Sequence, residues 1–138
     1  MSVQAARVTT PRVLLVEDDR DSCAMLAFAL KRGGFEVATA PDGLDALEWF
    51  REHRTDALVT DVFMPRMDGI MLIQAIRELS RDVPIVAISA GWNVANLQVN
   101  EELVEKDVLV AARRAGADRT FSKPVDPLAV VSAVRSLL

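Results

Sequence analysis

Short runs of aliphatic and β-branched residues recur along the chain, separated by longer segments in which apolar residues follow a helical period. The clearest runs are residues 12–16, 57–60 and 85–88, which are too short for helices and apolar on both faces. Such runs are typical of central parallel strands. Weaker candidates lie at residues 36–39 and 119–122. The pattern therefore predicts five strands.

The segments between these runs predict helices. The first is expected from about residue 21 to residue 32, where a pair of glycines ends it. The stripes that define the first three helices are Met25, Leu26, Ala29 and Leu30; Leu44, Leu47 and Phe50; and Ile70, Ile73 and Ile76. A fourth helix ends before Gly116, and a fifth begins with Asp126 as its N-cap and Pro127 at its first helical position.

Strands that alternate with helices predict an α/β fold, a doubly wound (βα)5 arrangement with right-handed crossovers. Residues 1–11 lack a period and are interpreted as a flexible tail, which leaves residues 12–138 for one folded domain. In such folds ligands bind beyond the carboxyl ends of the strands. Functional residues are therefore expected directly after strands.

Composition and charge narrow the possible classes of function. A chain of 138 residues that is 51% hydrophobic is expected to form one core. Its net charge of -4, without a basic face, disfavours direct binding to nucleic acids and to membranes. The single cysteine forms no internal disulfide, and no apolar run reaches the roughly 20 residues of a membrane span. We therefore expect a cytoplasmic protein.

Chemically active side chains stand at the ends of four predicted strands. In chain order they are Glu17, Asp18 and Asp19; Asp61; Ser89 and Ala90; and Lys123 and Pro124. Carboxylates held close together repel one another unless a cation joins them, and a few protein oxygens with room for water and phosphate suit Mg²⁺. Asp61 is then a candidate nucleophile toward a phosphoryl group, with Lys123 and Ser89 as donors to its oxygens.

These residues, together with the run Asp61–Gly69 (DVFMPRMDG), resemble the receiver domain of two-component response regulators over about residues 11–138. The resemblance implies a three-layer, flavodoxin-like (βα)5 sandwich with strand order 2-1-3-4-5, and it implies that Asp61 is phosphorylated. The implied Mg²⁺ ligands are Glu17, Asp18, Asp61 and the main-chain carbonyl of Phe63. The implied phosphate contacts are Ser89, Ala90 and Lys123.

The resemblance also implies partners. The only histidine, His53, lies among charged residues at the end of the second helix, so the phosphoryl group is expected from a phosphohistidine of a histidine kinase or histidine phosphotransfer protein. We expect a stand-alone receiver, a monomer or weak dimer, that signals through a downstream protein partner or a phosphate relay. No enzymatic activity is expected beyond its own phosphorylation and dephosphorylation.

Several acids and one glycine have a structural interpretation. Asp19 is expected mainly as the N-cap of the first helix and Asp68 as that of the third, because an acid before a helix accepts hydrogen bonds from its free N–H groups. Gly69 is expected to shape the loop after the nucleophile. Glu17 and Asp18, taken alone, fit capping as well as metal binding.

Two features depart from the family pattern. Receivers usually carry a switching aromatic residue three positions before the lysine, where this chain has Thr120, followed by Phe121. The span from Ser89 to Lys123 is 34 residues, longer than usual. The surplus is predicted as an insertion at about residues 91–106, before or within the fourth helix. It is either a passive loop or a segment ordered by a partner or by phosphorylation.

Two other functions stay open. A pseudo-receiver would act only as a protein-binding module, and the presence of Asp61 and Lys123 argues against it. An aspartate-nucleophile phosphohydrolase would carry a second acid two residues after the nucleophile, where this chain has Phe63. A nucleotide-binding fold is disfavoured because no glycine-rich loop follows the first strand.

Overall fold

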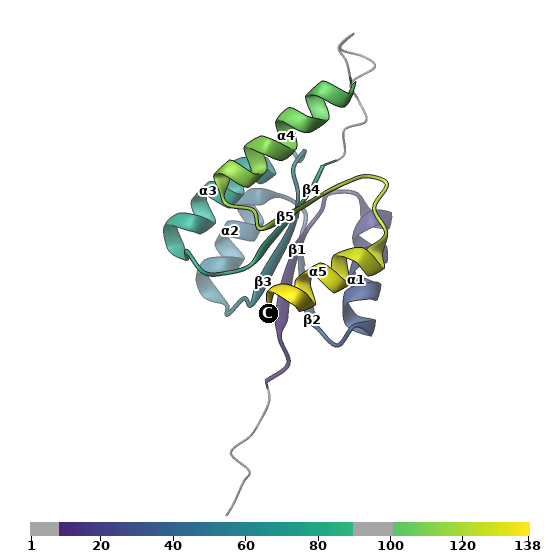
Figure 1. The fold of residues 1–138 in the computed structure, drawn as a ribbon. Helices are drawn as coiled ribbons and strands as arrows, with labels where there is room; N and C mark the ends of the chain where they lie inside the picture. Colours follow the sequence, from purple (N-terminus) through teal and green to yellow (C-terminus); the bar gives the residue numbers. More distant parts are fainter. Residues whose placement is uncertain (1–8, 90–100) are drawn as a thin grey trace, which may run out of the picture.

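The computed structural model describes residues 9–89 and 101–138, except for the side chains of residues 101–107. Within this part of the chain, five strands and five helices alternate (Figure 1). The strands are β1 (Arg12–Val16), β2 (Glu36–Ala40), β3 (Ala57–Asp61), β4 (Ile85–Ser89) and β5 (Arg119–Ser122). The helices are α1 (Arg20–Arg32), α2 (Gly43–Glu52), α3 (Gly69–Leu79), α4 (Glu101–Ala115) and α5 (Pro127–Leu137).

The strands form one parallel sheet in the order β2-β1-β3-β4-β5, which confirms the predicted fold class and strand order. The chain moves outward from β1 to β2 and then returns across β1 to β3. The strand order therefore reverses between β1 and β3, and a doubly wound sheet opens its ligand crevice at that point. Val16 is level with Thr60, and Asp61 with Ile88, so the carboxyl ends of these strands meet at one edge.

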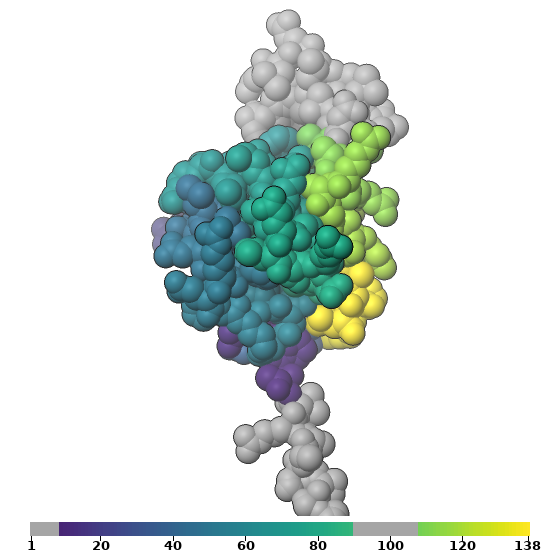
Figure 2. Space-filling model, turned by 90° about the vertical axis from the view of Figure 1, so that its left-hand side faces the viewer, coloured from purple at the N-terminus to yellow at the C-terminus, as the bar shows by residue number. Residues whose placement is uncertain are grey.

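Helices cover both faces of the sheet. In Figure 1, α1 and α5 lie on one side, and α2, α3 and α4 lie on the other. Figure 2 views the second side, where α2 (blue) packs beside α3 (teal). Successive residues of a strand point to opposite faces. Accordingly, Val13 and Leu15 of β1 pack with α1 and α5, while Leu14 and Val16 pack with α2 and α3.

Burial explains why some strands were clear in the sequence and others weak. Every residue of β3 and β4 is buried, so both faces are apolar. The edge strands β2 and β5 consist of exposed and half-buried residues, apart from the buried Ala40 at the end of β2. Each edge strand has one sheet neighbour and incomplete cover, so its sequence carries fewer apolar residues.

Most predicted helix ends are confirmed. The side chains of Asp19, Asp68 and Asp126 cap α1, α3 and α5 by accepting hydrogen bonds from main-chain N–H groups two or three residues later, at 2.8, 2.9 and 2.9 Å. Gly34 and Gly116 follow α1 and α4 with φ angles of 97° and 130°, a region that side chains disfavour.

Two residues of the apolar stripes that predicted the first two helices are exposed. Met25 is 51% exposed and Leu44 is 42% exposed. Ala27 and Ala46 are buried instead, on α1 and α2. Each exposed residue stands two positions before the buried alanine, which is almost the opposite side of a helix with about 3.6 residues per turn.

Two predicted segments fall largely outside the described residues. The predicted flexible tail includes residues 1–8, and the predicted insertion includes residues 91–100. The remainder of that insertion, residues 101–106, belongs to α4. Among the described residues, no helix combines the length and the apolar character that crossing a membrane requires.

Candidate functional site

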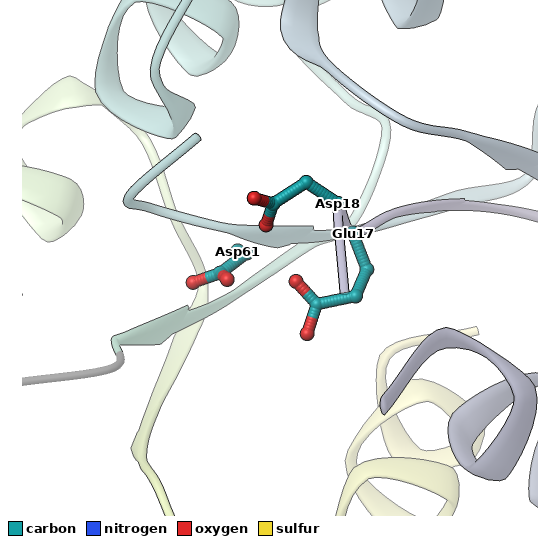
Figure 3. A group of neighbouring side chains, drawn as sticks. All are labelled: Glu17, Asp18 and Asp61. Carbon is teal, nitrogen blue, oxygen red and sulfur yellow. The ribbon is translucent and has the colours of Figure 1, made fainter. Parts of the chain in front are cut away.

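Three acids converge where β1 and β3 end (Figure 3). Glu17 and Asp18 follow β1, and Asp61 is the last residue of β3. Each offers one carboxylate oxygen, and these oxygens all lie within 4.8 Å of one another. Glu17 and Asp61 are buried, at 4% and 5% exposure, while Asp18 is open to solvent. The cluster therefore combines two buried carboxylates with one that faces water.

Lys123 reaches into this cluster from the end of β5. Its Nζ donates to Oε1 of Glu17 at 2.7 Å and to Oδ2 of Asp61 at 3.2 Å. Its main-chain N–H donates to the carbonyl of Ser89 at 2.8 Å, which fixes the loop after β5 against the end of β4. One ammonium group thus pairs with two of the three clustered carboxyl groups.

This imbalance of charge changes the protonation of Glu17. Burial raises the pKa of Glu17 to about 7, the neighbouring Asp61 carboxyl adds to the rise, and Lys123 opposes it without cancelling it. Burial lowers the pKa of Lys123, but the carboxyl groups of Glu17 and Asp61 outweigh burial and raise it overall. The lysine therefore stays charged, and the site retains negative charge that a further cation would neutralise.

Two buried polar atoms at this edge have no hydrogen-bond partner among the described residues: Oε2 of Glu17 and Oγ of Ser89. Ser89 is fully buried at the end of β4. An unsatisfied buried polar group costs about 1–3 kcal/mol. The free Glu17 oxygen, in a set of carboxylate donors, fits a hard cation such as Mg²⁺. The free Ser89 hydroxyl is available as a donor to a ligand oxygen.

The loop after Asp61 is held tightly at its start and end. The N–H of Val62 donates to Oδ1 of Asp61 at 2.8 Å and to the carbonyl of Ile88 at 2.9 Å. The N–H of Gly69 donates to the carbonyl of Val62 at 2.7 Å. A Cβ at Gly69 would overlap the carbonyl oxygen of Asp61. This close approach of α3 to Asp61 explains the glycine that was predicted to shape the loop.

An ion pair that sequence reasoning missed holds the middle of the same loop. Arg66 has a φ of 70°, and its Nη1 lies 3.0 Å from Oδ2 of the buried Asp42. The other oxygen of Asp42 caps α2 by accepting from the N–H of Asp45 at 2.9 Å. Asp42 before Gly43 signals a helix start in the sequence, but no local pattern links it to a loop 24 residues later.

The remaining predicted site residues are more scattered. Asp19 caps α1 and is not among the three clustered acids, and the N–H and hydroxyl of Ser22 lower the pKa of its carboxyl. Pro124 follows Lys123 through a cis peptide bond. The Phe63 side chain is 41% exposed. Ala90 lies outside the described residues.

Thr120 and Phe121 point to different layers. Phe121 packs against the core between the sheet and α1 and α5. Thr120 is level with Ala87 on β4, and it is half-buried. Because successive strand residues point to opposite faces, Phe121 does not supply a ring on the α4 side of β5. The departure noted in the sequence therefore persists in the fold.

Comparisons with known proteins agree on one family. The model of the response regulator receiver domain matches residues 13–135. Transcriptional regulatory protein PrrA of Mycobacterium tuberculosis is 42% identical over 131 residues, which are 95% of this chain and 51% of PrrA. The chain thus spans about half the length of the curated relatives it matches.

Solved structures agree. The Francisella response regulator 1452 receiver domain is 26% identical, with a TM-score of 0.75 over 93% of this chain and 96% of that one. The chemotaxis protein CheY4 of Vibrio cholerae is also 26% identical, with a TM-score of 0.75 over 94% of this chain and 100% of that one.

Proposed function

Because this chain belongs to the response regulator receiver domain family of two-component systems, we propose that it accepts a phosphoryl group on the carboxylate of Asp61. Receiver domains are phosphoacceptors that interact with histidine kinases and downstream effectors, and they bind Mg²⁺ in an acidic pocket. The observation that carries the proposal is the convergence of Glu17, Asp18 and Lys123 on Asp61.

Glu17, Asp18, Asp61 and the main-chain carbonyl of Phe63 are the proposed Mg²⁺ ligands. The unpaired oxygen of Glu17 and the excess of carboxyl groups over ammonium groups support this assignment. When bound, Mg²⁺ would neutralise charge on the carboxylates and on the phosphoryl oxygens.

In the proposed reaction a carboxylate oxygen of Asp61 attacks phosphorus in a phosphohistidine of a sensor kinase or phosphotransfer protein. The new P–O bond forms as the P–N bond breaks, and the imidazole leaves with the electron pair. Lys123, which the neighbouring acids keep charged, and the unpaired hydroxyl of Ser89 would donate to the phosphoryl oxygens. The N–H group of Ala90 is a proposed further donor.

The proposed output is phosphorylation-dependent binding of a protein partner, or relay of the phosphoryl group to one. Thr120 occupies the position where receivers usually carry a switching aromatic residue, and Phe121 packs in the opposite layer. This arrangement favours a response to phosphorylation that does not depend on the movement of an aromatic side chain at position 120. PrrA is named a transcriptional regulatory protein, and this chain matches 51% of its length.

The direct test is phosphorylation with a small donor. The purified chain incubated with Mg²⁺ and acetyl phosphate is expected to gain one phosphoryl group by intact-mass measurement. Asp61→Asn should abolish the adduct. Asp68→Asn is the matched control, because asparagine still caps α3 and this acid lies outside the cluster. A stable adduct on the Asp61→Asn chain would refute the assignment, and no adduct on the wild-type chain would favour a pseudo-receiver.

A further inference from the structure

Among the residues that the structure describes, five polar side chains are buried, and all five stand at or just beyond the carboxyl ends of the strands. Glu17, Asp61 and Ser89 belong to the site described above, and Asp42 caps α2. The fifth is Thr60, which precedes Asp61 on β3 and is fully buried. A buried hydroxyl is costly unless it forms a hydrogen bond, so the partner of Thr60 indicates its role.

The surroundings of Thr60 do not themselves require a hydroxyl. Thr60 is level with Val16 on β1 and with Ala87 on β4, and both neighbours are buried and apolar. Valine has the same branched shape as threonine and would suit this row of the sheet at least as well. The hydroxyl of Thr60 donates to the main-chain carbonyl of Asp61 at 2.8 Å. This hydrogen bond is therefore what threonine adds at the position.

The accepting carbonyl belongs to the peptide group that joins Asp61 to Val62. The N–H of the same peptide group donates to Oδ1 of Asp61 at 2.8 Å and to the carbonyl of Ile88 at 2.9 Å. A hydrogen bond accepted by an amide carbonyl polarises the amide and strengthens its N–H as a donor. Thr60 therefore acts on a carboxylate oxygen of Asp61 through a single peptide group.

The same peptide group is also confined by α3. A Cβ on Gly69 would lie 2.2 Å from the carbonyl oxygen of Asp61, so a glycine is needed for α3 to begin this close. The N–H of Val62 holds Oδ1 of Asp61, while Oδ2 lies 3.2 Å from Nζ of Lys123. The peptide group and the lysine together thus fix the orientation of the whole carboxylate.

We propose that Thr60 is a positioning residue for the phosphorylation of Asp61, an inference that rests on the function proposed above. Its hydroxyl holds the Asp61–Val62 peptide group, and the N–H of that group holds Oδ1. Oδ2 is thereby kept facing Lys123 and the incoming phosphoryl group. Thr60 acts through the peptide group and not by contact with the phosphoryl group. Without its hydroxyl the carboxylate samples more orientations, and fewer of them align an oxygen for attack.

The first test is the rate at which the chain gains a phosphoryl group from acetyl phosphate at saturating Mg²⁺, followed by intact-mass measurement. Thr60→Val keeps the shape but removes the donor, so it should slow the reaction by about ten-fold. Thr60→Ser restores a hydroxyl donor and should recover the rate to within about two-fold of the wild type. Ile76→Val, at a fully buried residue of α3, is the matched control, since it lowers stability but should leave the rate within about two-fold of the wild type.

The second test is hydrogen exchange of single amides, which needs no phosphorylation. The reference is the N–H of Leu58, which donates to the carbonyl of Pro84 at 2.9 Å earlier on the same strand. The ratio of the Val62 exchange rate to the Leu58 exchange rate should rise about ten-fold in Thr60→Val, because the peptide group after Asp61 is held less firmly. Taking this ratio separates a local change from a loss of global stability.

Phosphorylation of Thr60→Val at the wild-type rate would overturn the inference and leave the proposed function intact. The same holds if Thr60→Ser or Ile76→Val is as slow as Thr60→Val, because the loss would then not come from the missing hydroxyl. An unchanged ratio of the Val62 and Leu58 exchange rates would likewise overturn the inference. A wild-type chain that gains no phosphoryl group would instead refute the proposed function, and this inference with it.

Discussion

At the amino ends of β4 and β5, Arg77 and Asp118 join a fully hydrogen-bonded cluster. At the carboxyl ends of the strands, by contrast, carboxyl groups outnumber ammonium groups, and Oε2 of Glu17 and Oγ of Ser89 have no partner among the described residues. Both groups contain buried or half-buried charges. At the first edge each charge meets an opposite charge or a main-chain group. At the second edge three carboxyl groups cluster, and Lys123 forms ion pairs with two of them, Glu17 and Asp61.

The Arg77 cluster links two loops. The guanidinium donates to the carbonyl of Gly116 at 2.7 and 3.1 Å and to that of Val83 at 2.7 Å, and it pairs with Asp118 at 3.2 Å. The same oxygen of Asp118 accepts from the N–H of Ile85 at 2.8 Å. This edge therefore fixes where β4 and β5 begin.

The difference teaches how one set of residue types serves stability at one edge and ligand binding at the other. A charge whose hydrogen bonds are all made within the fold stabilises the fold. A charge left without partners destabilises the fold until a ligand supplies them. On this account, substitutions of the same kind should have opposite effects on stability at the two edges.

The largest expected effect comes from breaking the amino edge. Arg77→Met removes the guanidinium donor from the carbonyls of Gly116 and Val83 and breaks the ion pair with Asp118, so the free energy of unfolding should fall by about 3 kcal/mol. Urea titration measures this change. Arg81→Met, at an exposed neighbour, should change it by less than about 0.5 kcal/mol. Equal effects of the two substitutions would show that the cluster is not stabilising.

A second prediction concerns the pH dependence of the metal-free chain. The pKa of Glu17 is raised from 4.5 to about 7, so between these values the folded chain binds more protons than the unfolded chain. The contribution of Glu17 to stability is therefore complete below pH 4.5 and is lost as pH rises toward 7, by about 2 kcal/mol.

Urea titrations across this pH range measure the effect. Glu17→Gln should remove the dependence, and Asp19→Asn, which keeps the cap of α1, should retain it. Saturating Mg²⁺ should restore stability at the higher pH, because a bound cation favours the ionised carboxylate. A wild-type profile that matches the profile of Glu17→Gln would contradict the assignment.

The charged cluster at the carboxyl edge could be predicted from the sequence, whereas the cluster at the amino edge could not. Glu17, Asp61 and Lys123 each follow a recognisable strand, and parallel strands bring their carboxyl ends together. Arg77 and Asp118 carry no comparable signal in the sequence. Arg77 donates mainly to main-chain carbonyls, and Asp118 accepts from a main-chain N–H group and from Arg77. The ion pair between Arg66 and Asp42 was missed for a different reason, because its two members are far apart in the sequence and no local pattern links them. Helical spacing correctly predicted the first helix, but it did not show that Met25 would be exposed.

A smaller effect is expected at Phe63, and it rests on the proposed phosphorylation. An apolar side chain two residues after Asp61 offers no group that would orient an attacking water. Phe63→Asn should therefore shorten the half-life of the phosphorylated chain by about three- to ten-fold, since ten-fold in rate corresponds to about 1.4 kcal/mol in the barrier. Mass spectrometry over time measures it. The phosphorylated Phe63→Leu variant should have a half-life close to that of the wild type. If the half-life of Phe63→Asn also equals that of the wild type, Phe63 does not control hydrolysis.

The smallest effect is expected at Arg66, where the carboxyl edge does have a satisfied ion pair. Arg66→Ala removes the contact with Asp42 and should weaken Mg²⁺ binding by about two- to five-fold by loosening the loop that carries the Phe63 carbonyl. Arg66→Gly also relieves the positive φ, so its loss should be smaller. Titration calorimetry compares both with Arg51→Ala, an exposed control on α2. Unchanged affinity in Arg66→Ala would leave the pair with no role at the metal site.

The measurement that tests the contrast most directly is the free energy of unfolding of Asp61→Asn and Asp118→Asn, each with and without Mg²⁺ at pH 8. Asp61→Asn should raise metal-free stability by about 1 kcal/mol and remove the gain that Mg²⁺ gives the wild type. Asp118→Asn should lower stability by about 1–2 kcal/mol and keep that gain. Two variants destabilised alike, with Asp61→Asn still stabilised by Mg²⁺, would contradict the account.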